Sequence, residues 1–103
     1  MKIFERLNAL RTYQRKHMPY LESLEDLDLV CAIGCAQELE RPISPSDLVD
    51  MQLGSTPTVR RRLARLINQQ IVVRRADAED GRRVLLHLSA KVFKTYAKLD
   101  TLC

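Results

Sequence analysis

Arginine is the residue type in this sequence that is most suited to chemistry at a surface, and it is concentrated in one segment. Between Ser55 and Arg83 there are eight basic residues, and every one of them is an arginine. The planar guanidinium group donates paired hydrogen bonds that match phosphate oxygens and the edge of guanine, which lysine does not. A surface that serves only solubility usually mixes lysine with arginine. This segment therefore favours nucleic acid as a partner.

The charge of the chain is polarised along its length. Residues 1–53 hold 6 basic and 9 acidic side chains, a net charge of −3, whereas residues 54–103 hold 11 basic and 4 acidic ones, a net charge of +7. The formal net charge of the whole chain is +4. Because the distribution of charge is more informative than its total, we expect the second half to face a polyanion.

Other reactive side chains give weaker signals. His17 and His87 are isolated from any nucleophile or paired carboxylate in the sequence, so we expect no enzymatic activity and no cofactor. Cys31 and Cys35 are four residues apart in an apolar segment and would supply half a metal site, but no further ligand follows at a suitable spacing. We expect them to be buried core thiols, with no metal bound. Cys103 is the thiol most suited to a redox switch, which stays a hypothesis.

Length and composition indicate one domain. A chain of 103 residues with 46% apolar residues is long enough to bury one core and too short for two. We therefore expect residues 1–103 to form a single domain. No apolar run approaches the roughly 20 residues of a membrane-spanning helix, and the N-terminal segment is not signal-like, so we expect a cytoplasmic protein.

Two helices are expected before the arginine-rich segment. Apolar residues recur at helical spacing over residues 3–15, and this helix should end before Pro19. Ser23 is expected to cap a second helix, with Asp26 three residues later as a short version of the capping box. The acidic residues around this cap should lie away from DNA: Glu22, Glu25, Asp26 and Asp28.

The next segment predicts a helix-turn-helix. Residues 41–43 are an extended connector or a one-turn edge strand, and Ser44 followed by Pro45 begins a short helix that ends near Met51. Gly54 is expected to take a left-handed conformation in the turn. Ser55 followed by Thr56 and Pro57 then begins a fourth helix by the same pattern of cap and proline. Two helices joined by a tight turn form a helix-turn-helix.

The fourth helix has an apolar and a basic side. At about 100° per residue, Val59, Leu63, Leu66 and Ile67 gather on one face. The opposite face is predicted to carry Thr58, Arg61, Arg65 and Asn68, with Arg60 and Arg62 beside it.

A β-hairpin and a final helix complete the chain. Residues 71–75 and 84–88 read as two short strands, joined by turn residues at 78–81. Ser89 should cap a last helix that runs over 89–102. The predicted fold class is mostly α with a small β-hairpin wing: a winged helix-turn-helix in the order α-α-α-α-β-β-α.

The hairpin carries the most specific pattern of the sequence. Asp77, Asp80, Arg82, Leu88 and Ser89 match, at the same spacing, the wing and helix cap of the MarR family of transcriptional regulators, with Ser89 in the place of a threonine. The sequence from Ser44 to Ser89 therefore resembles this family. It departs from the family pattern at Gln70, where a glycine usually ends the recognition helix, and at Gly81, where a second charged wing residue is common.

The resemblance implies a repressor-like transcriptional regulator that binds double-stranded DNA. With the fourth helix in the major groove, Thr58, Arg61 and Arg65 would face base edges. Ser55 and Thr56 would hold a phosphate at the positive end of that helix. Arg82 would reach the flanking minor groove, and Asp80 would orient it through a charge-assisted pair. The predicted DNA-binding residues are Ser55, Thr56, Thr58, Arg60, Arg61, Arg62, Arg65, Arg74, Arg82 and Arg83.

Assembly and regulation follow from the same resemblance. The terminal helices, 3–15 and 89–102, are expected to pack across a two-fold axis and form a homodimer on a palindromic operator. A small-molecule effector is possible in this family, and no effector is predicted. The alternative is a winged-helix module that binds an acidic protein instead of DNA. Salt dependence and competition by DNA would distinguish the two.

Overall fold

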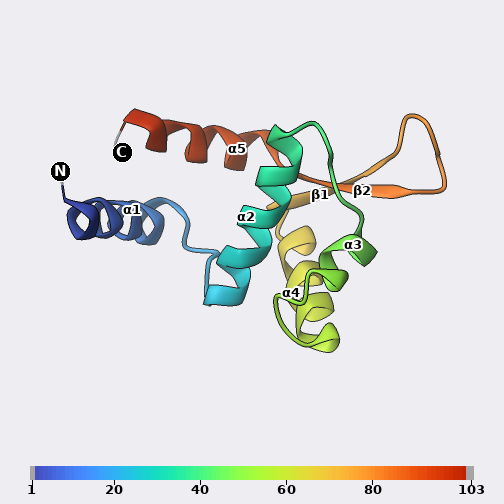
Figure 1. Cartoon of the computed structure of the whole chain (residues 1–103), viewed down its shortest axis with the longest axis horizontal. Helices are drawn as coiled ribbons and strands as arrows, with labels where there is room; N and C mark the ends of the chain where they lie inside the picture. The colour runs from blue at the N-terminus through green and yellow to red at the C-terminus, as the bar shows by residue number, and fades with distance from the viewer. Residues whose placement is uncertain (1, 102–103) are drawn as a thin grey trace.

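The computed structural model describes the backbone of residues 2–101 and the side chains of residues 2–99. The molecule is elongated, measuring 46 × 27 × 22 Å. The hairpin lies at one end, and α1 with the end of α5 lies at the other (Figure 1). The predictions for Leu102 and Cys103 lie outside the described residues. The elements are α1 (Ile3–His17), α2 (Leu24–Glu38), α3 (Pro45–Asp50), α4 (Thr56–Asn68), β1 (Val72–Ala76), β2 (Val84–Leu88), α5 (Ala90–Ala97) and a 3-10 helix, η1 (Lys98–Thr101).

Serine side chains begin four of the helices, as the sequence predicted. In each case the hydroxyl oxygen accepts from the backbone N–H three residues later, at 3.1–3.3 Å, for Ser23, Ser44, Ser55 and Ser89. At α3 the bond is reciprocal, because the backbone N–H of Ser44 donates to Asp47 Oδ2 at 3.0 Å. This pair satisfies two N–H groups that the start of a helix leaves without partners.

Left-handed residues follow α2, α3 and α4, and none of the three is a glycine. Glu40, Gln52 and Gln70 have φ angles of 59°, 56° and 62°. The prediction that Gly54 takes this conformation is wrong, because the turn between α3 and α4 reverses at Gln52 instead. After α4, the N–H of Gln70 donates to Ile67 O and the N–H of Ile71 donates to Leu66 O. These two backbone hydrogen bonds form a Schellman motif, which favours glycine at its left-handed position. Gln70 occupies that position here.

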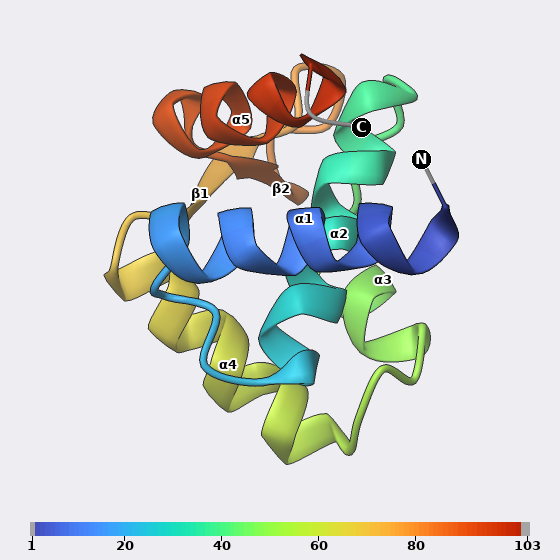
Figure 2. The same cartoon turned by 90° about the vertical axis from the view of Figure 1, so that its left-hand side faces the viewer.

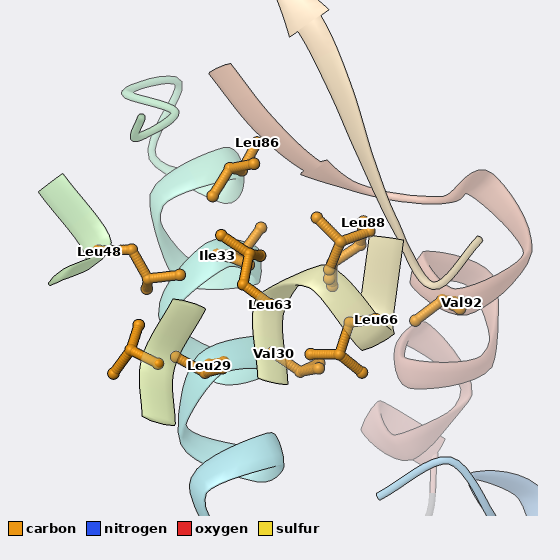
Figure 3. Packing of buried hydrophobic residues seen from close by; sticks show 11 residues of the cluster. Leu29, Val30, Ile33, Leu48, Leu63, Leu66, Leu86, Leu88 and Val92 are labelled. Carbon is orange, nitrogen blue, oxygen red and sulfur yellow. The ribbon is translucent and has the colours of Figure 1, made fainter. Parts of the chain in front are cut away.

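The core lies between α2, α3, α4 and the hairpin. Ile33, Leu48, Leu66 and Leu86 have no exposed surface, and they come from four different elements (Figure 3). The apolar face predicted for α4 is confirmed, since Val59 and Leu63 are also buried. Each fully buried aliphatic side chain of this kind contributes about 1.5–3 kcal/mol. This core fixes α4 against α2 and thereby decides which face of α4 is free.

The hairpin pairs its two strands without interruption from Val72 opposite Leu88 to Ala76 opposite Val84. Its inner end is buried and its outer end is exposed, so the strands extend beyond the core as a wing. The segment before α3 is an extended connector, and it makes one hydrogen bond to the hairpin, from Leu86 N–H to Ile43 O at 2.8 Å.

The terminal helices lie side by side at one end of the molecule (Figure 2). Tyr13 Oη donates to Thr95 O at 2.9 Å and joins α1 to α5. The first two turns of α1 leave Ile3, Phe4 and Leu7 exposed by 60%, 79% and 44%. The last helix is shorter than predicted, because it tightens into η1 after Ala97. No helix within residues 2–101 has the length and apolar character needed to span a membrane.

Cys31 and Cys35 correct another prediction. They were expected to be buried in the core, but both thiols are exposed. The buried face of α2 consists of Asp26, Leu29, Val30, Ile33 and Gly34. Cys31 and Cys35 point to another side of this helix because they fall outside that helical repeat.

Candidate nucleic-acid interface

The exposed face of α4 is a narrow stripe along the helix. Its members recur at intervals of three and four residues: Pro57, Arg60, Arg61, Ala64 and Asn68. Side chains at this spacing lie above one another on one face. The stripe places two free arginines near the start of the helix and a small apolar side chain one turn later. This is the face that the core leaves available to a partner.

The N-terminus of α4 is exposed and well ordered by its own side chains. Ser55 Oγ accepts from the Thr58 N–H at 3.3 Å and donates to Thr58 Oγ1 at 2.8 Å. Ser55 and Thr56 are exposed, whereas Thr58 is half-buried. The first N–H groups of a helix carry partial positive charge, which suits this end of α4 to a phosphate oxygen.

Arg65 lies elsewhere than the sequence predicted. It was placed on the outer face with Arg61, but its guanidinium points inward to α2. Arg65 Nη2 donates to Asp26 Oδ2 at 2.6 Å and to Tyr20 O at 2.8 Å. The reason is the position of Arg62 and Arg65 around the axis of α4. Both residues lie at the border between its buried face and its exposed face. A long side chain at that border reaches the beginning of α2.

Asp26 is the centre of this ionic cluster, although it was predicted only to complete a capping box with Ser23 and to lie away from DNA. Its side chain has no exposed surface, and its Oδ2 also accepts from the Glu22 N–H at 3.0 Å and from Arg62 Nη1 at 3.4 Å. Burial acts to raise the pKa of Asp26, but the hydrogen bonds from Arg65 and Glu22 and the charges of both arginines outweigh it. The net result is a lowered pKa, so the carboxylate remains ionised.

The loop of the wing is shaped by its two aspartates. Asp77 Oδ1 accepts from the Glu79 N–H at 3.0 Å, and Asp80 Oδ1 accepts from the Arg82 N–H at 3.1 Å. The predicted ion pair between Asp80 and the Arg82 guanidinium is therefore replaced by a bond to the Arg82 backbone. Short acidic side chains stabilise turns in this way. The Arg82 side chain itself is exposed.

The base of the wing is tied to the helix-turn-helix. Arg83 Nη2 donates to Asp47 Oδ2 at 2.7 Å, between two half-exposed side chains. A hydrogen bond from the Ser44 N–H, and then the Ser44 hydroxyl and Arg83, lower the pKa of Asp47. Arg83 was predicted to bind DNA, and in the free protein it links the wing to α3. Arg74, which was also predicted to bind DNA, is exposed on β1.

The sequence assigned no site role to two exposed residues, Ala64 and Arg75, and did not predict the ionic role of the buried Asp26. Ala64 is exposed in the middle of the α4 stripe, and Arg75 is exposed beside Arg74 on the wing. Ala64 had a signal in the sequence, since it follows Arg60 and Arg61 by one turn. Arg75 lies next to Arg74 but was assigned no role. Asp26 had no local signal, because it is 39 residues from Arg65.

Two cavities lie away from the α4 stripe. One, of about 730 Å³, lies between the end of α1, the end of α4 and the start of α5, with His17, Tyr20, Gln70 and Lys91 among its lining residues. The other, of about 530 Å³, lies between α2, β2 and α5. No group of three or more histidine, cysteine or acidic side chains within residues 2–99 is arranged to hold a metal ion.

Comparison with known proteins gives structural matches only. No protein-family model and no curated protein matches the sequence. Staphylococcus aureus MepR bound to ethidium bromide superposes with a TM-score of 0.70 at 17% identity, over 96% of this chain and 69% of that chain. A MepR–DNA complex gives 0.65 at 16%, over 96% and 76%. MarR from E. coli gives 0.59 at 21%, over 99% and 76%. The chain therefore has the winged helix-turn-helix fold of MepR and MarR, as its sequence predicted.

Proposed function

We propose that this protein is a sequence-specific DNA-binding transcriptional regulator, with α4 in the major groove and the wing on the flanking minor groove. The observation that carries the proposal is the exposed stripe of α4, which holds Arg60 and Arg61 beside a wing that holds Arg74, Arg75 and Arg82. A helix of this width fits the major groove, and arginine reads guanine there. The similarity to MepR in its DNA complex supports this placement.

The arginines divide into two groups in this proposal. Arg60, Arg61 and Arg82 are exposed and contact DNA, whereas Arg62 and Arg65 are engaged by Asp26 and hold α4 in place. Base reading therefore falls to Arg61 with its neighbours on the stripe. Ala64 offers a methyl group that suits the C5-methyl of thymine. Ser55 and Thr56 position the helix on a phosphate and carry no sequence information.

Assembly as a homodimer is part of the proposal. Ile3, Phe4 and Leu7 form an exposed apolar patch on α1, which a single chain leaves in water. A second copy packed across α1 and the end of α5 would cover it. Two recognition helices related by a two-fold axis would then read half-sites about 34 Å apart, or one turn of DNA.

An effector site is also proposed, at the cavity of about 730 Å³ beside the end of α4. Its walls join α1 and α5, the proposed dimer elements, to Gln69 and Gln70 at the end of the recognition helix. A ligand there would change the position of α4 relative to the dimer axis. MepR has been solved with ethidium bromide, which supports small-molecule binding by this fold.

The proposal is tested by fluorescence anisotropy with genomic and random duplexes across a range of salt concentrations. Arg61→Ala and Arg82→Ala should weaken binding and reduce the slope of log K against log salt by about 1 per lost phosphate contact. Arg61→Ala should also reduce the preference for genomic over random duplex, since base contacts provide specificity. Arg41→Ala is the matched control and should leave the slope unchanged, because Arg41 is an exposed arginine between α2 and α3, outside the proposed DNA surface and dimer elements.

Two outcomes would overturn the DNA-binding proposal. One is a wild-type protein that binds no duplex at low salt. The other is a pair of variants, Arg61→Ala and Arg82→Ala, that bind as the wild type does. Binding to acidic proteins that DNA fails to displace would instead support the alternative of a protein-binding module. Analytical ultracentrifugation of the Phe4→Glu variant tests dimer formation separately. We expect the monomer–dimer equilibrium of this variant to shift toward the monomer.

A further inference from the structure

Cys31 and Cys35 form a pair of free thiols on one side of α2. Both are exposed, and they are four residues apart on a continuous helix. Residues at this spacing have Cβ atoms about 5–6 Å apart, so a single atom can bridge their sulfurs. The pair is therefore a dithiol rather than two independent cysteines.

The dithiol opens onto a mostly apolar groove. Both cysteines line the cavity of about 530 Å³, together with Leu88, Phe93, Tyr96 and Leu99 and with the exposed carboxylate of Glu38. Gly34 lies between the two cysteines and brings the helix backbone close to β2, because a Cβ there would be 3.1 Å from Leu88 Cδ1. Tyr96 Oη is buried and has no hydrogen-bond partner among the described residues. The groove thus combines two thiols, aromatic walls and one unused hydroxyl group.

The chemistry of this pair does not suit zinc. Zinc sites in proteins have four ligands, or three with an open position, and no third candidate ligand lies with the two thiols among the described residues. Metal ions also require thiolates. Burial, followed by the charges of Asp28 and Cys35, raises the pKa of Cys31 and keeps it protonated at neutral pH. A ligand for this site must therefore complete its own coordination beyond the two sulfurs.

We propose that Cys31 and Cys35 form a binding site for trivalent arsenic, which bridges the two sulfurs while its third substituent occupies the groove. Two thiols condense with an arsenic oxide. With phenylarsine oxide, two S–H bonds and the As=O bond break, two As–S bonds form, and the two protons leave with the oxygen as one water. With arsenous acid, two of the three As–OH bonds break, two waters leave, and the third hydroxyl stays on arsenic. Arsenic remains trivalent and no oxidant is needed. An aromatic third substituent fits the walls formed by Phe93, Tyr96 and Leu99.

The test uses the full-length, reduced protein titrated with phenylarsine oxide and, separately, with arsenite. The expected result is one phenylarsenic group per chain by intact mass, bound more tightly than arsenite because only the former has an aromatic ring. Cys31→Ser and Cys35→Ser should each lower the affinity by about 100-fold or more, since loss of either thiol removes the chelate. Cys103→Ser is the matched control and should bind as the wild type does.

Clear results would contradict this inference. It fails if the native protein binds no arsenical while the urea-unfolded protein does, because the groove would then be covered. It fails equally if Cys31→Ser retains full affinity, or if Cys103→Ser abolishes binding. Circular dichroism of each variant verifies folding, and counting the remaining thiols with an aromatic disulfide reagent verifies that Cys31 or Cys35 is still exposed. None of these readouts involves DNA, so they are independent of the proposed function.

Discussion

Asp26→Asn tests the ionic cluster that holds the recognition helix. The substitution keeps the shape of the side chain and removes its charge. In the wild type, Oδ2 accepts three hydrogen bonds, from Arg65 at 2.6 Å, the Glu22 N–H at 3.0 Å and Arg62 at 3.4 Å. Oδ1 is buried without a partner among the described residues. The asparagine removes the carboxylate that opposes Arg62 at the boundary between α2 and α4, and it leaves Arg65 with the exposed Glu22, whose Oε1 lies 3.6 Å from Arg65 Nη1.

The loss of stability that we expect for Asp26→Asn depends on how deeply the aspartate and its two arginine partners are buried. Removing one partner of a fully buried ion pair costs about 3–5 kcal/mol. Asp26 has no exposed surface, but the side chains of Arg62 and Arg65 are 24% and 23% exposed. Water therefore reaches the arginines after the substitution, and Arg65 keeps its bond to Tyr20 O. We expect a loss of about 2–3 kcal/mol in the free energy of unfolding, below the fully buried value.

The pH dependence provides a second signature. Because the pKa of Asp26 is lowered from its ordinary value of 3.8, its contribution to stability is fully present above that value. The contribution is lost as the pH falls through the lower pKa of the folded state. The difference between wild type and Asp26→Asn should thus be constant from neutral pH to about pH 5 and should shrink below about pH 4.

Urea unfolding followed by circular dichroism, at one fixed protein concentration, measures both effects. Asp28→Asn is the matched control, since Asp28 lies on the same helix and is exposed, and we expect a change within about 0.5 kcal/mol. The reasoning is refuted if Asp26→Asn is as stable as this control or if its deficit does not change with pH. If the protein binds DNA as proposed, release of Arg62 and Arg65 should also steepen the salt slope, by up to about 2.

Three further predictions concern helix ends and the docking of α1. Gln70→Gly should stabilise the protein by about 0.5–1 kcal/mol in thermal unfolding because it relieves a left-handed residue; Gln69→Gly, at an ordinary φ of −85°, should destabilise it instead. Ser44→Ala should cost about 1 kcal/mol in urea unfolding by removing the cap of α3, whereas Ser46→Ala, exposed within that helix, should have little effect. Tyr13→Phe should speed amide exchange in α1 while leaving α4 unchanged, because it removes the bond from Tyr13 to Thr95; equal exchange in α1 would show that this bond does not hold the helix.

The sequence alone was sufficient for the local features of the fold. The serine caps at Ser44 and Ser55, and the turn that Asp77 stabilises in the wing, are interactions between residues two or three positions apart. Such signals do not depend on the rest of the chain. They predicted the helix-turn-helix, the wing and the apolar face of α4, and the structure agrees with all three.

Only the tertiary structure decided which polar groups are free. Eight arginines look alike in the sequence, but Arg62 and Arg65 are bound by an aspartate on another helix, 36 and 39 residues away, while Arg61 is exposed. Cys31 looked like a core residue by composition and is exposed by helical phase. The physical reason is common to both cases: a side chain's environment depends on the angle at which its helix packs, and this angle is set by long-range burial of the core.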